Sequence, residues 1–358
     1  MTPLEKEIRE LIAYEGRITF ERFMRLALYH PTLGYYRRQF DPVGRGGDFV
    51  TAPEISSAFG ACLARAIAAS WEAMGRPKRF SILEFGAGSG FLAARIMQAL
   101  SERHPELCSA ATYTVCEQNY RIRSAIKPPE SFLRTKKYRA LSFHEIPGER
   151  VSGCIISNEF FDAFSVHRLR CIRGVLAECY IDVDEKGLFR ESFDVPSWDF
   201  IGKFWERYGI ALAENQEAEI SLKALEAFDV MANILEEGSI ITVDYGDVAE
   251  RLYSAHPQGT LMTYRQQRAD ADYYSLVGEK DITAHVNFAA LMRRGEELGY
   301  KNALFTTQAR FLTDFGIADE MPAVIDTVEA ANLSQQIKQL LSPSAMGERF
   351  KVLVQKKM

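Results

Sequence analysis

Cysteine is scarce and scattered in this chain. Six cysteines occur among 358 residues, at Cys62, Cys108, Cys116, Cys154, Cys171 and Cys179, and no two of them form a C-x-x-C pair. This spacing excludes a zinc ribbon and a disulfide scaffold, because both depend on closely and regularly placed cysteines. Several of the cysteines lie in apolar runs, where a thiol packs as a small hydrophobic group. We therefore expect a soluble protein of a reducing compartment, with no metal site.

Long hydrophobic runs and an excess of positive charge are also missing. The best apolar candidate, 61–71, is short and contains Arg65, whereas a membrane helix needs about 20 apolar residues. The first residues, MTPLEKEIREL, carry three acids, which fits neither a secretory signal nor a transit peptide. With 43 basic and 48 acidic residues the formal charge is −5, so nucleic acid is disfavoured as the main partner. These features predict a cytoplasmic protein without membrane insertion, and they leave its oligomeric state open.

What the chain does contain is an alternation of short β-rich runs and helical patterns, in an ordinary globular composition with 47% apolar residues. The expected strands are 80–85, 111–116, 154–157, 239–243, 303–307 and 350–354, and the expected helices between and after them are 91–100, 120–126, 288–298 and 324–341. Such alternation predicts an α/β fold with a parallel sheet covered on both faces.

Three regions follow from the same patterns. Residues 1–75 have mostly helical spacing and include Thr51-Ala-Pro-Glu54, a capping box that opens a helix. Residues 166–237 combine hairpin patterns with helical ones. We therefore expect an N-terminal helical cap (1–75), a core (76–165 and 238–358) and an inserted subdomain (166–237).

A glycine-rich loop, Glu84-Phe-Gly86-Ala-Gly88-Ser-Gly90, joins the first expected strand to a helix. Glycines permit a tight turn and let the backbone approach a ligand closely, while the helix begins with free N–H groups. The dinucleotide fingerprint G-x-G-x-x-G fits this loop poorly, because position 91 is Phe. The next expected strand ends in Glu117, 27 residues past Gly90, where a carboxylate can bridge ribose hydroxyls. The E-x-G-x-G-x-G form resembles motif I of S-adenosylmethionine methyltransferases, which favours that cofactor over NAD.

Polar residues follow two later strands. Asn158, Glu159 and Asp162 come directly after the third expected strand, and Asp244 follows the fourth. The carboxyl ends of the strands are where an open α/β sheet binds its ligand, although acids here can also serve a helix N-terminus. His285, one of six histidines, completes the candidates, although a lone histidine is more often structural than catalytic.

These pieces, in this order, resemble the MidA family of S-adenosylmethionine-dependent methyltransferases, which includes the mitochondrial complex I assembly factor that methylates an arginine. The resemblance covers nearly the whole chain and rests, besides the glycine loop, on the strings LYHPTLGYY (28–36), GDFVTAPEIS (47–56), SNEFFDA (157–163), DYG (244–246) and DITAHV (281–286). It implies a seven-stranded class I, Rossmann-like methyltransferase sheet with a helical cap and a substrate-facing β-hairpin and helical insertion.

The resemblance also implies an activity and a set of residues. The activity is protein arginine N-methyltransfer from S-adenosyl-L-methionine, on a protein substrate that includes respiratory-complex subunits by family analogy. The cofactor residues are Glu84, Gly86, Gly88, Gly90, Glu117, Gly47 and Thr51. A guanidinium acceptor suits carboxylates, which accept bidentate hydrogen bonds.

The expected roles at the acceptor are therefore as follows. Glu159 and Asp162 pair with the acceptor, Asn158 positions it, and His285 or Asp244 accepts the proton or supports the site. Two rival functions stay open: an S-adenosylmethionine-binding assembly factor or chaperone without turnover, gripping its partner with the aromatic residues between 193 and 208, and an NAD(P)-dependent oxidoreductase.

Overall fold

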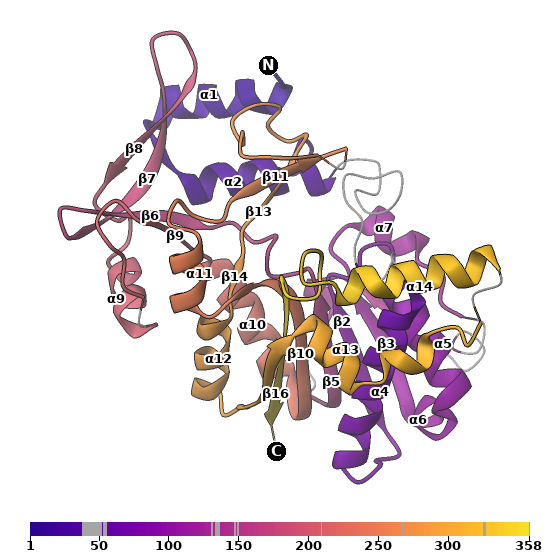
Figure 1. Ribbon diagram of the computed structural model, residues 1–358. Coiled ribbons are helices and arrows are strands. Elements are labelled where there is room, and N and C mark those ends of the chain that lie inside the picture. Colours follow the sequence, from indigo (N-terminus) through magenta and orange to yellow (C-terminus); the bar gives the residue numbers. More distant parts are fainter. Residues whose placement is uncertain are drawn as a thin grey trace.

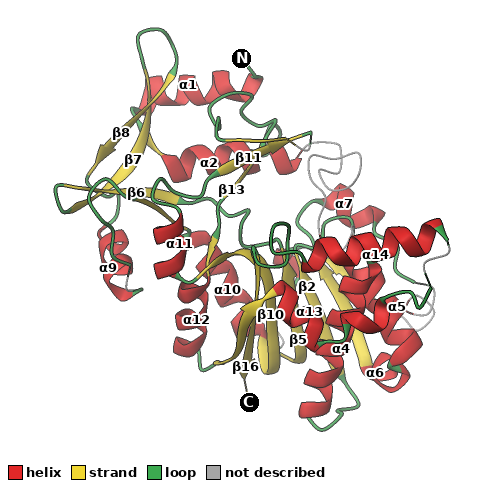
Figure 2. Cartoon of the chain, in the orientation of Figure 1, coloured by secondary structure: helices red, strands yellow, loops and turns green. Residues whose placement is uncertain are grey.

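The apolar runs of the middle and end of the chain pair into an eight-stranded sheet (Figures 1 and 2). The computed structural model describes residues 1–37, 52, 56–129, 132, 137–146, 148, 150–208, 210–266, 268–324 and 327–357. Along the sheet the strands are β15 (Lys301–Thr307), β16 (Phe350–Lys357), β10 (Leu235–Asp247), β5 (Val151–Asn158), β2 (Phe80–Phe85), β3 (Ala111–Cys116) and β4 (Tyr138–Leu141), with β14 (Val286–Asn287) beside β10. From β10 to β4 neighbouring strands are parallel, and only β16 runs against its neighbours β10 and β15.

Each face of this sheet has its own hydrophobic cluster, because successive side chains of a strand point to opposite faces. Phe80 and Ile82 of β2 lie in the cluster of one face, and Leu83 and Phe85 lie in that of the other. The first face is covered by α4 (Ser57–Ala73), α5 (Phe91–Arg103), α6 (Pro105–Ala110), α13 (Gln308–Asp314) and α14 (Val328–Leu341), and the second by α10 (Leu222–Ile234), α11 (Ala249–Ala255) and α12 (Phe288–Glu297). The predicted α/β fold with a doubly covered, mainly parallel sheet is confirmed.

A second layer sits beside the carboxyl ends of the parallel strands (Figure 1). It contains a five-stranded sheet of β1 (Ile18–Thr19), β6 (His167–Ile172), β7 (Val175–Val183), β8 (Phe189–Asp194) and β9 (Glu217–Ile220), and a three-stranded sheet of β11 (Met262–Arg265), β12 (Arg268–Asp270) and β13 (Asp281–Thr283). Helices α1 (Pro3–Glu15) and α2 (Phe20–Tyr29) pack with both sheets in a third hydrophobic cluster. The predicted hairpins after residue 166 are therefore present, and they hold the N-terminal helices.

The structure divides the chain differently from the expected regions. Helix α4 packs on the main sheet through Phe59, Leu63, Ile67 and Trp71, rather than with α1 and α2. Strands β11, β12 and β13, which fall in the expected core region 238–358, join the second layer instead. The reason is physical in both cases: a helix or strand follows the face on which its apolar side chains are buried, whatever its place in the sequence. Thr51, Pro53 and Glu54 of the expected capping box lie outside the described residues.

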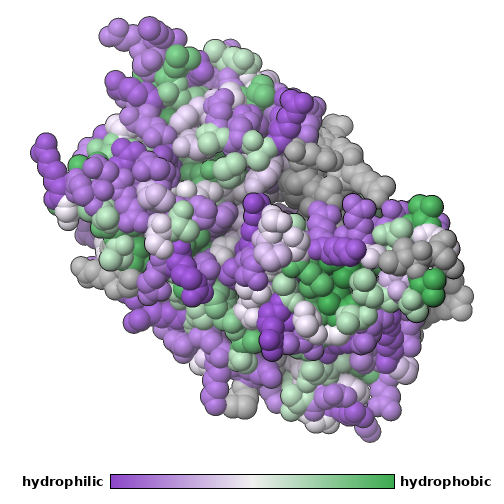
Figure 3. Space-filling model, in the orientation of Figure 1, coloured by the Kyte–Doolittle hydropathy of each residue, from purple (hydrophilic) through white to green (hydrophobic). Residues whose placement is uncertain are grey.

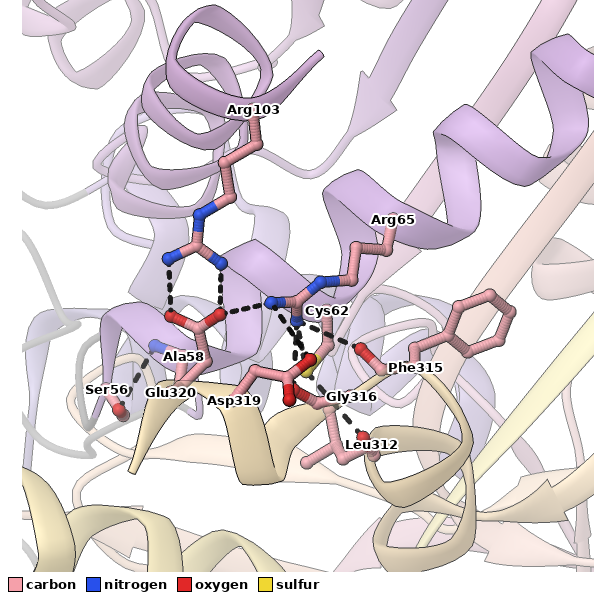
Figure 4. Close-up of polar contacts among 10 residues, drawn as sticks. All are labelled: Ser56, Ala58, Cys62, Arg65, Arg103, Leu312, Phe315, Gly316, Asp319 and Glu320. Carbon is pink, nitrogen blue, oxygen red and sulfur yellow. Dashed lines mark hydrogen bonds and ion pairs between the residues drawn. The ribbon is translucent and has the colours of Figure 1, made fainter. Parts of the chain in front are cut away.

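Two arginines on neighbouring helices fix the position of the segment after α13. Arg65 of α4 and Arg103 of α5 both bind the carboxylate of Glu320, in the short helix η3 (Ile317–Glu320) (Figure 4). Arg65 also donates to the backbone oxygens of Phe315 (3.0 Å) and Gly316 (3.1 Å). Although burial acts in the opposite direction, the two arginines lower the pKa of Glu320. This charge cluster joins three elements of the first face.

The face of the molecule shown in Figure 3 is mostly hydrophilic, with hydrophobic residues in smaller areas. Among the described residues, no helix combines the length and the apolar character required to cross a bilayer.

Candidate functional site at the carboxyl ends of the parallel strands

A cavity of about 380 Å³ is lined by residues at the carboxyl ends of β2, β3 and β5. The strand order reverses here, since β3 and β4 follow on one side of β2, and β5 and β10 on the other. Open α/β sheets bind ligands at such switch points. The lining comes from the glycine loop, the segment after β3, the segment after β5, and the N-terminal helices.

The glycine loop wraps one end of this cavity in a backbone shape that suits glycine. Gly86, Gly88 and Gly90 have φ angles of 70°, 50° and 80°, and Gly90 is the N-cap residue of α5. A Cβ added to Gly86 would lie 2.7 Å from the Phe160 ring, and one added to Gly90 would lie 2.5 Å from Ile126. A Cβ on Gly88, in contrast, would meet open space. The loop therefore packs closely on its two flanks and leaves room over its centre, as a cradle for a ligand requires.

Glu117 lies at the end of β3, next to the loop. Its carboxylate accepts hydrogen bonds from the backbone N–H of Gly88 (3.0 Å) and of Asn119 (2.7 Å). Asn119 in turn caps α7 (Tyr120–Ala125) and donates to the backbone oxygen of Tyr36 (2.9 Å). The structure thus brings Glu117 and the loop together around one cavity, as the sequence predicted.

Glu84, the acid that opens the loop motif, is almost fully buried in β2 yet reaches the cavity lining. Its carboxyl accepts a 2.5 Å hydrogen bond from the hydroxyl of Tyr113. Burial raises the pKa of Glu84 to about 7, and the Tyr113 hydrogen bond only partly opposes this effect. Near neutral pH this carboxyl is therefore balanced between its two charge states.

Asn158 and Glu159 form the other end of the cavity, where β5 stops. Glu159 is not a glycine, yet its φ is 48°, and its N–H donates to the backbone oxygen of Val243 (3.0 Å). The Asn158 amide donates to the Glu159 carboxylate (3.2 Å), and the Asn158 Oδ1 atom is buried without a hydrogen-bond partner among the described residues. A left-handed conformation costs a non-glycine residue roughly 1–3 kcal/mol and persists only where the surroundings impose it. The backbone here holds a carboxylate at the edge of the cavity.

Asp244 helps to hold the backbone that follows Glu159. It is completely buried, and one carboxylate oxygen accepts from the backbone N–H groups of Phe160 (3.2 Å), Phe161 (2.9 Å) and Asp162 (3.4 Å). Burial, together with the negative charges of Asp162 and Glu159, raises the pKa of Asp244 well above its usual range. Asp244 does not line the cavity; it braces the turn that follows Glu159.

Asp162 and His285 also lie behind the lining. Asp162 accepts a short hydrogen bond from the hydroxyl of Tyr245, and burial raises its pKa to about 6. The His285 ring packs against Tyr245 and His256, with ring centroids 5.3 Å and 4.9 Å apart. Burial, followed by the charge of His256, lowers the pKa of His285 to about 4, so its imidazole is neutral at neutral pH. These two candidates therefore reach the end of the cavity formed by Asn158 and Glu159 only through intervening groups.

The lining also includes residues that the sequence did not single out as site residues. Tyr29 and Tyr36 contribute from the N-terminal helices, and Phe143 and Phe164 add apolar surface. The two tyrosines belong to the string 28–36 that carried the family resemblance, so a signal existed, but nothing in the sequence placed that string in the same cavity as Glu159. Gly47 and Thr51 lie outside the described residues.

The residues present fit S-adenosylmethionine. The glycine loop leaves open space over Gly88, Glu117 offers a carboxylate beside it, and aromatic rings such as Phe143 and Phe160 line the cavity nearby. Among the described residues, no group of three or more His, Cys, Asp or Glu side chains could hold a metal ion.

Comparisons with known proteins point to the same cofactor. A sequence model of a family described as S-adenosyl-L-methionine-dependent methyltransferases matches residues 62–306. The mitochondrial protein arginine methyltransferase NDUFAF7 of Homo sapiens is 25% identical over 98% of this chain and 82% of its own length, and the Drosophila melanogaster homolog is 26% identical over 98% and 84%. A Burkholderia thailandensis protein solved with bound S-adenosyl-homocysteine is 30% identical, with a TM-score of 0.88 over 99% of this chain and 92% of that one.

Proposed function

Because this chain belongs to the family of S-adenosyl-L-methionine-dependent methyltransferases, we propose that it methylates a guanidinium nitrogen of an arginine in a protein substrate. The cofactor is S-adenosyl-L-methionine, which supplies an electrophilic methyl group on a sulfonium. The arginine acceptor is the proposed part, and it agrees with the names of the curated relatives. The observation that carries it is Glu159, a carboxylate held in a left-handed backbone conformation at the cavity edge, one strand away from the glycine loop.

On this proposal the cofactor residues are those of the loop and its neighbour. The backbone of Gly86 to Gly90, with Glu84 and Glu117, holds the cofactor, and Gly47 and Thr51 contribute from the segment outside the described residues. The alignment of donor and acceptor and the exclusion of water account for most of the rate enhancement that a protein can add to a displacement of this kind.

The acceptor side rests on Glu159. A guanidinium is protonated in water and offers only donors, so a carboxylate can bind it through paired hydrogen bonds. Asn158 orients the Glu159 carboxylate, while Asp244 and, through Tyr245, Asp162 keep the turn in place. The proton that leaves the methylated nitrogen has the Glu159 carboxylate as its nearest proposed acceptor.

Location and partner belong to the same proposal. We propose a cytoplasmic location, although the relatives are named as mitochondrial proteins; the six cysteines are free, which suits a reducing compartment. A respiratory-complex subunit is the partner that the family resemblance implies.

The test is methyl transfer to protein. Purified enzyme and tritiated S-adenosylmethionine are incubated with a lysate of cells that lack the gene, and the labelled protein is hydrolysed to amino acids. We expect the label in methylarginine and its absence with the Glu159→Gln variant. Label in methyl-lysine would contradict the arginine acceptor.

The same experiment addresses the assembly-factor alternative. That alternative assigns partner binding to the aromatic residues between 193 and 208. In the structure Phe204 and Tyr208 are buried in the core, and Trp198 and Phe200 are exposed. A protein that binds the cofactor and a partner but transfers no label at all would support that function instead.

A further inference from the structure

Two tyrosines from the second layer form a pair in the cavity wall. Tyr29 ends α2, and Tyr36 lies in the short helix η1 (Tyr35–Arg37); their rings stack with centroids 5.3 Å apart and planes 27° apart. The Tyr29 hydroxyl donates to the backbone oxygen of Ala163 (2.8 Å), and the Tyr36 hydroxyl donates to the carboxylate of Asp281 (2.9 Å). Both rings are therefore anchored at their far ends, Tyr29 to the turn after Glu159 and Tyr36 to β13.

Two hydrogen-bond acceptors line the same cavity as this pair. Asn158 Oδ1 is buried without a partner among the described residues, and the Glu159 carboxylate lies beside it. Both tyrosine hydroxyls already donate as above, and the Ser165 hydroxyl donates to the Glu21 carboxylate (2.7 Å). A ligand that brings donors can bind these acceptors, whereas a ligand with acceptors alone cannot.

Positive side chains also line the cavity, at its more exposed parts. Arg25 pairs with Glu21 (3.2 Å) and Lys223 pairs with Glu226 (2.7 Å), and both cations are about half exposed; Arg37 is the third. Exposed pairs of this kind are largely screened by water, so they oppose a cation at Glu159 only weakly.

We propose that Tyr29 and Tyr36, together with Asn158 and Glu159, form an acceptor subsite that recognises the planar guanidinium group. This inference rests on the proposed function and deepens it. A guanidinium is planar, weakly hydrated and stacks on aromatic rings, whereas an ammonium is a compact and strongly hydrated point charge. The aromatic pair thus selects arginine over lysine, and the carboxylate alone would not.

The test uses small probes on the full chain saturated with S-adenosyl-homocysteine. Ethylguanidinium, propylammonium and ethylurea, the neutral isostere of ethylguanidinium, are compared by saturation-transfer NMR, which requires no turnover. We expect ethylguanidinium to bind best, and we expect Tyr29→Leu and Tyr36→Leu each to weaken it about tenfold, a loss typical of a desolvated cation–π contact. Tyr29→Phe keeps the ring and should stay within about twofold of the wild type. The matched control is Tyr14→Leu on α1, because Tyr14 is 90% exposed, and it should have no effect.

The outcomes separate this inference from the proposed function. Unchanged affinity for S-adenosyl-homocysteine shows that each variant is folded. Equal binding of ethylguanidinium and propylammonium, or leucine variants that bind ethylguanidinium like the wild type, would overturn the subsite, even if methylarginine is found in the labelled protein. A subsite that behaves as expected while the label appears in another amino acid would instead overturn the proposed function.

Discussion

The two ends of the cavity are assembled in different ways. Among the described residues the cofactor end is built mainly from one continuous stretch, residues 84–119, in which Gly86 bonds to Cys116 (2.9 Å) and Gly88 to Glu117 (3.0 Å). The acceptor end is built from segments far apart in the chain, since the turn after Glu159 is held by Asp244 and by Tyr29, 134 residues before its partner Ala163. The described part of the first end is held mainly by bonds within its own stretch, while the second end depends on the second layer being docked.

This difference predicts that changes at the two ends have separable effects on cofactor binding and on methyl transfer. The four predictions below probe it, beginning with the largest expected effect.

Glu159→Gln tests the acceptor end alone. The amide keeps the size of the side chain but cannot accept a proton or pair with a cation, so we expect kcat to fall about a thousandfold, within the range for loss of a general base. Calorimetry should show unchanged affinity for S-adenosyl-homocysteine. Glu185→Gln, in an exposed turn, serves as the control. Weaker cofactor binding in the Glu159 variant would show that the two ends are coupled.

Gly88→Val tests the cofactor end alone. The valine side chain would enter the open space over the loop, at a φ of 50° that a β-branched residue disfavours. We expect affinity for S-adenosyl-homocysteine to fall by more than about a hundredfold, or roughly 3 kcal/mol, with an unchanged circular dichroism spectrum.

The matched control for that variant is Gly75→Val, in the turn before β2. Gly75 has a φ of 79° and equally open surroundings, but it does not line the cavity. It should show the same backbone strain and bind the cofactor product normally. If both variants lost binding equally, the effect would come from strain and not from the site.

These two predictions differ in how far the sequence could support them. Strands 80–85 and 111–116 are found with the predicted bounds, and the loop with Glu117 lies between and after them, so local patterns sufficed for the cofactor end. The short strands β4, β11, β12 and β13 were missed, because few of their side chains form an apolar run and their pairing partners set their place. The contact of Tyr29 with Ala163 could not be predicted for the same reason: it depends on how two layers dock.

Glu84 is expected to make the free energy of unfolding depend on pH. Its pKa in the folded protein is about 7, above its ordinary value of 4.5, so between these values the folded state holds a proton that the unfolded state has released. The free energy of unfolding is therefore highest, as far as Glu84 is concerned, below pH 4.5, and it falls as the pH rises to about 7. Urea unfolding of wild type and Glu84→Gln should show the variant gaining roughly 2–3 kcal/mol relative to wild type between pH 5 and pH 8. A pH-independent difference would contradict the raised pKa.

His285→Gln is expected to have the smallest effect. The ring lies behind the cavity lining and is neutral at neutral pH, so kcat should change by less than about tenfold, below the range for a catalytic acid or base. The pH profile of kcat should keep its shape. Loss of a titration step in that profile would restore His285 as a proton acceptor.

The account is tested most directly by a crystal structure of the protein with S-adenosyl-homocysteine. We predict density for the ligand along Gly86 to Gly88 with its ribose beside Glu117, and the cavity between its sulfur and Glu159 open to an acceptor. Density at any other place, or a ligand that fills the space next to Glu159, would contradict the claim that a single cavity at the strand switch point brings donor and acceptor together.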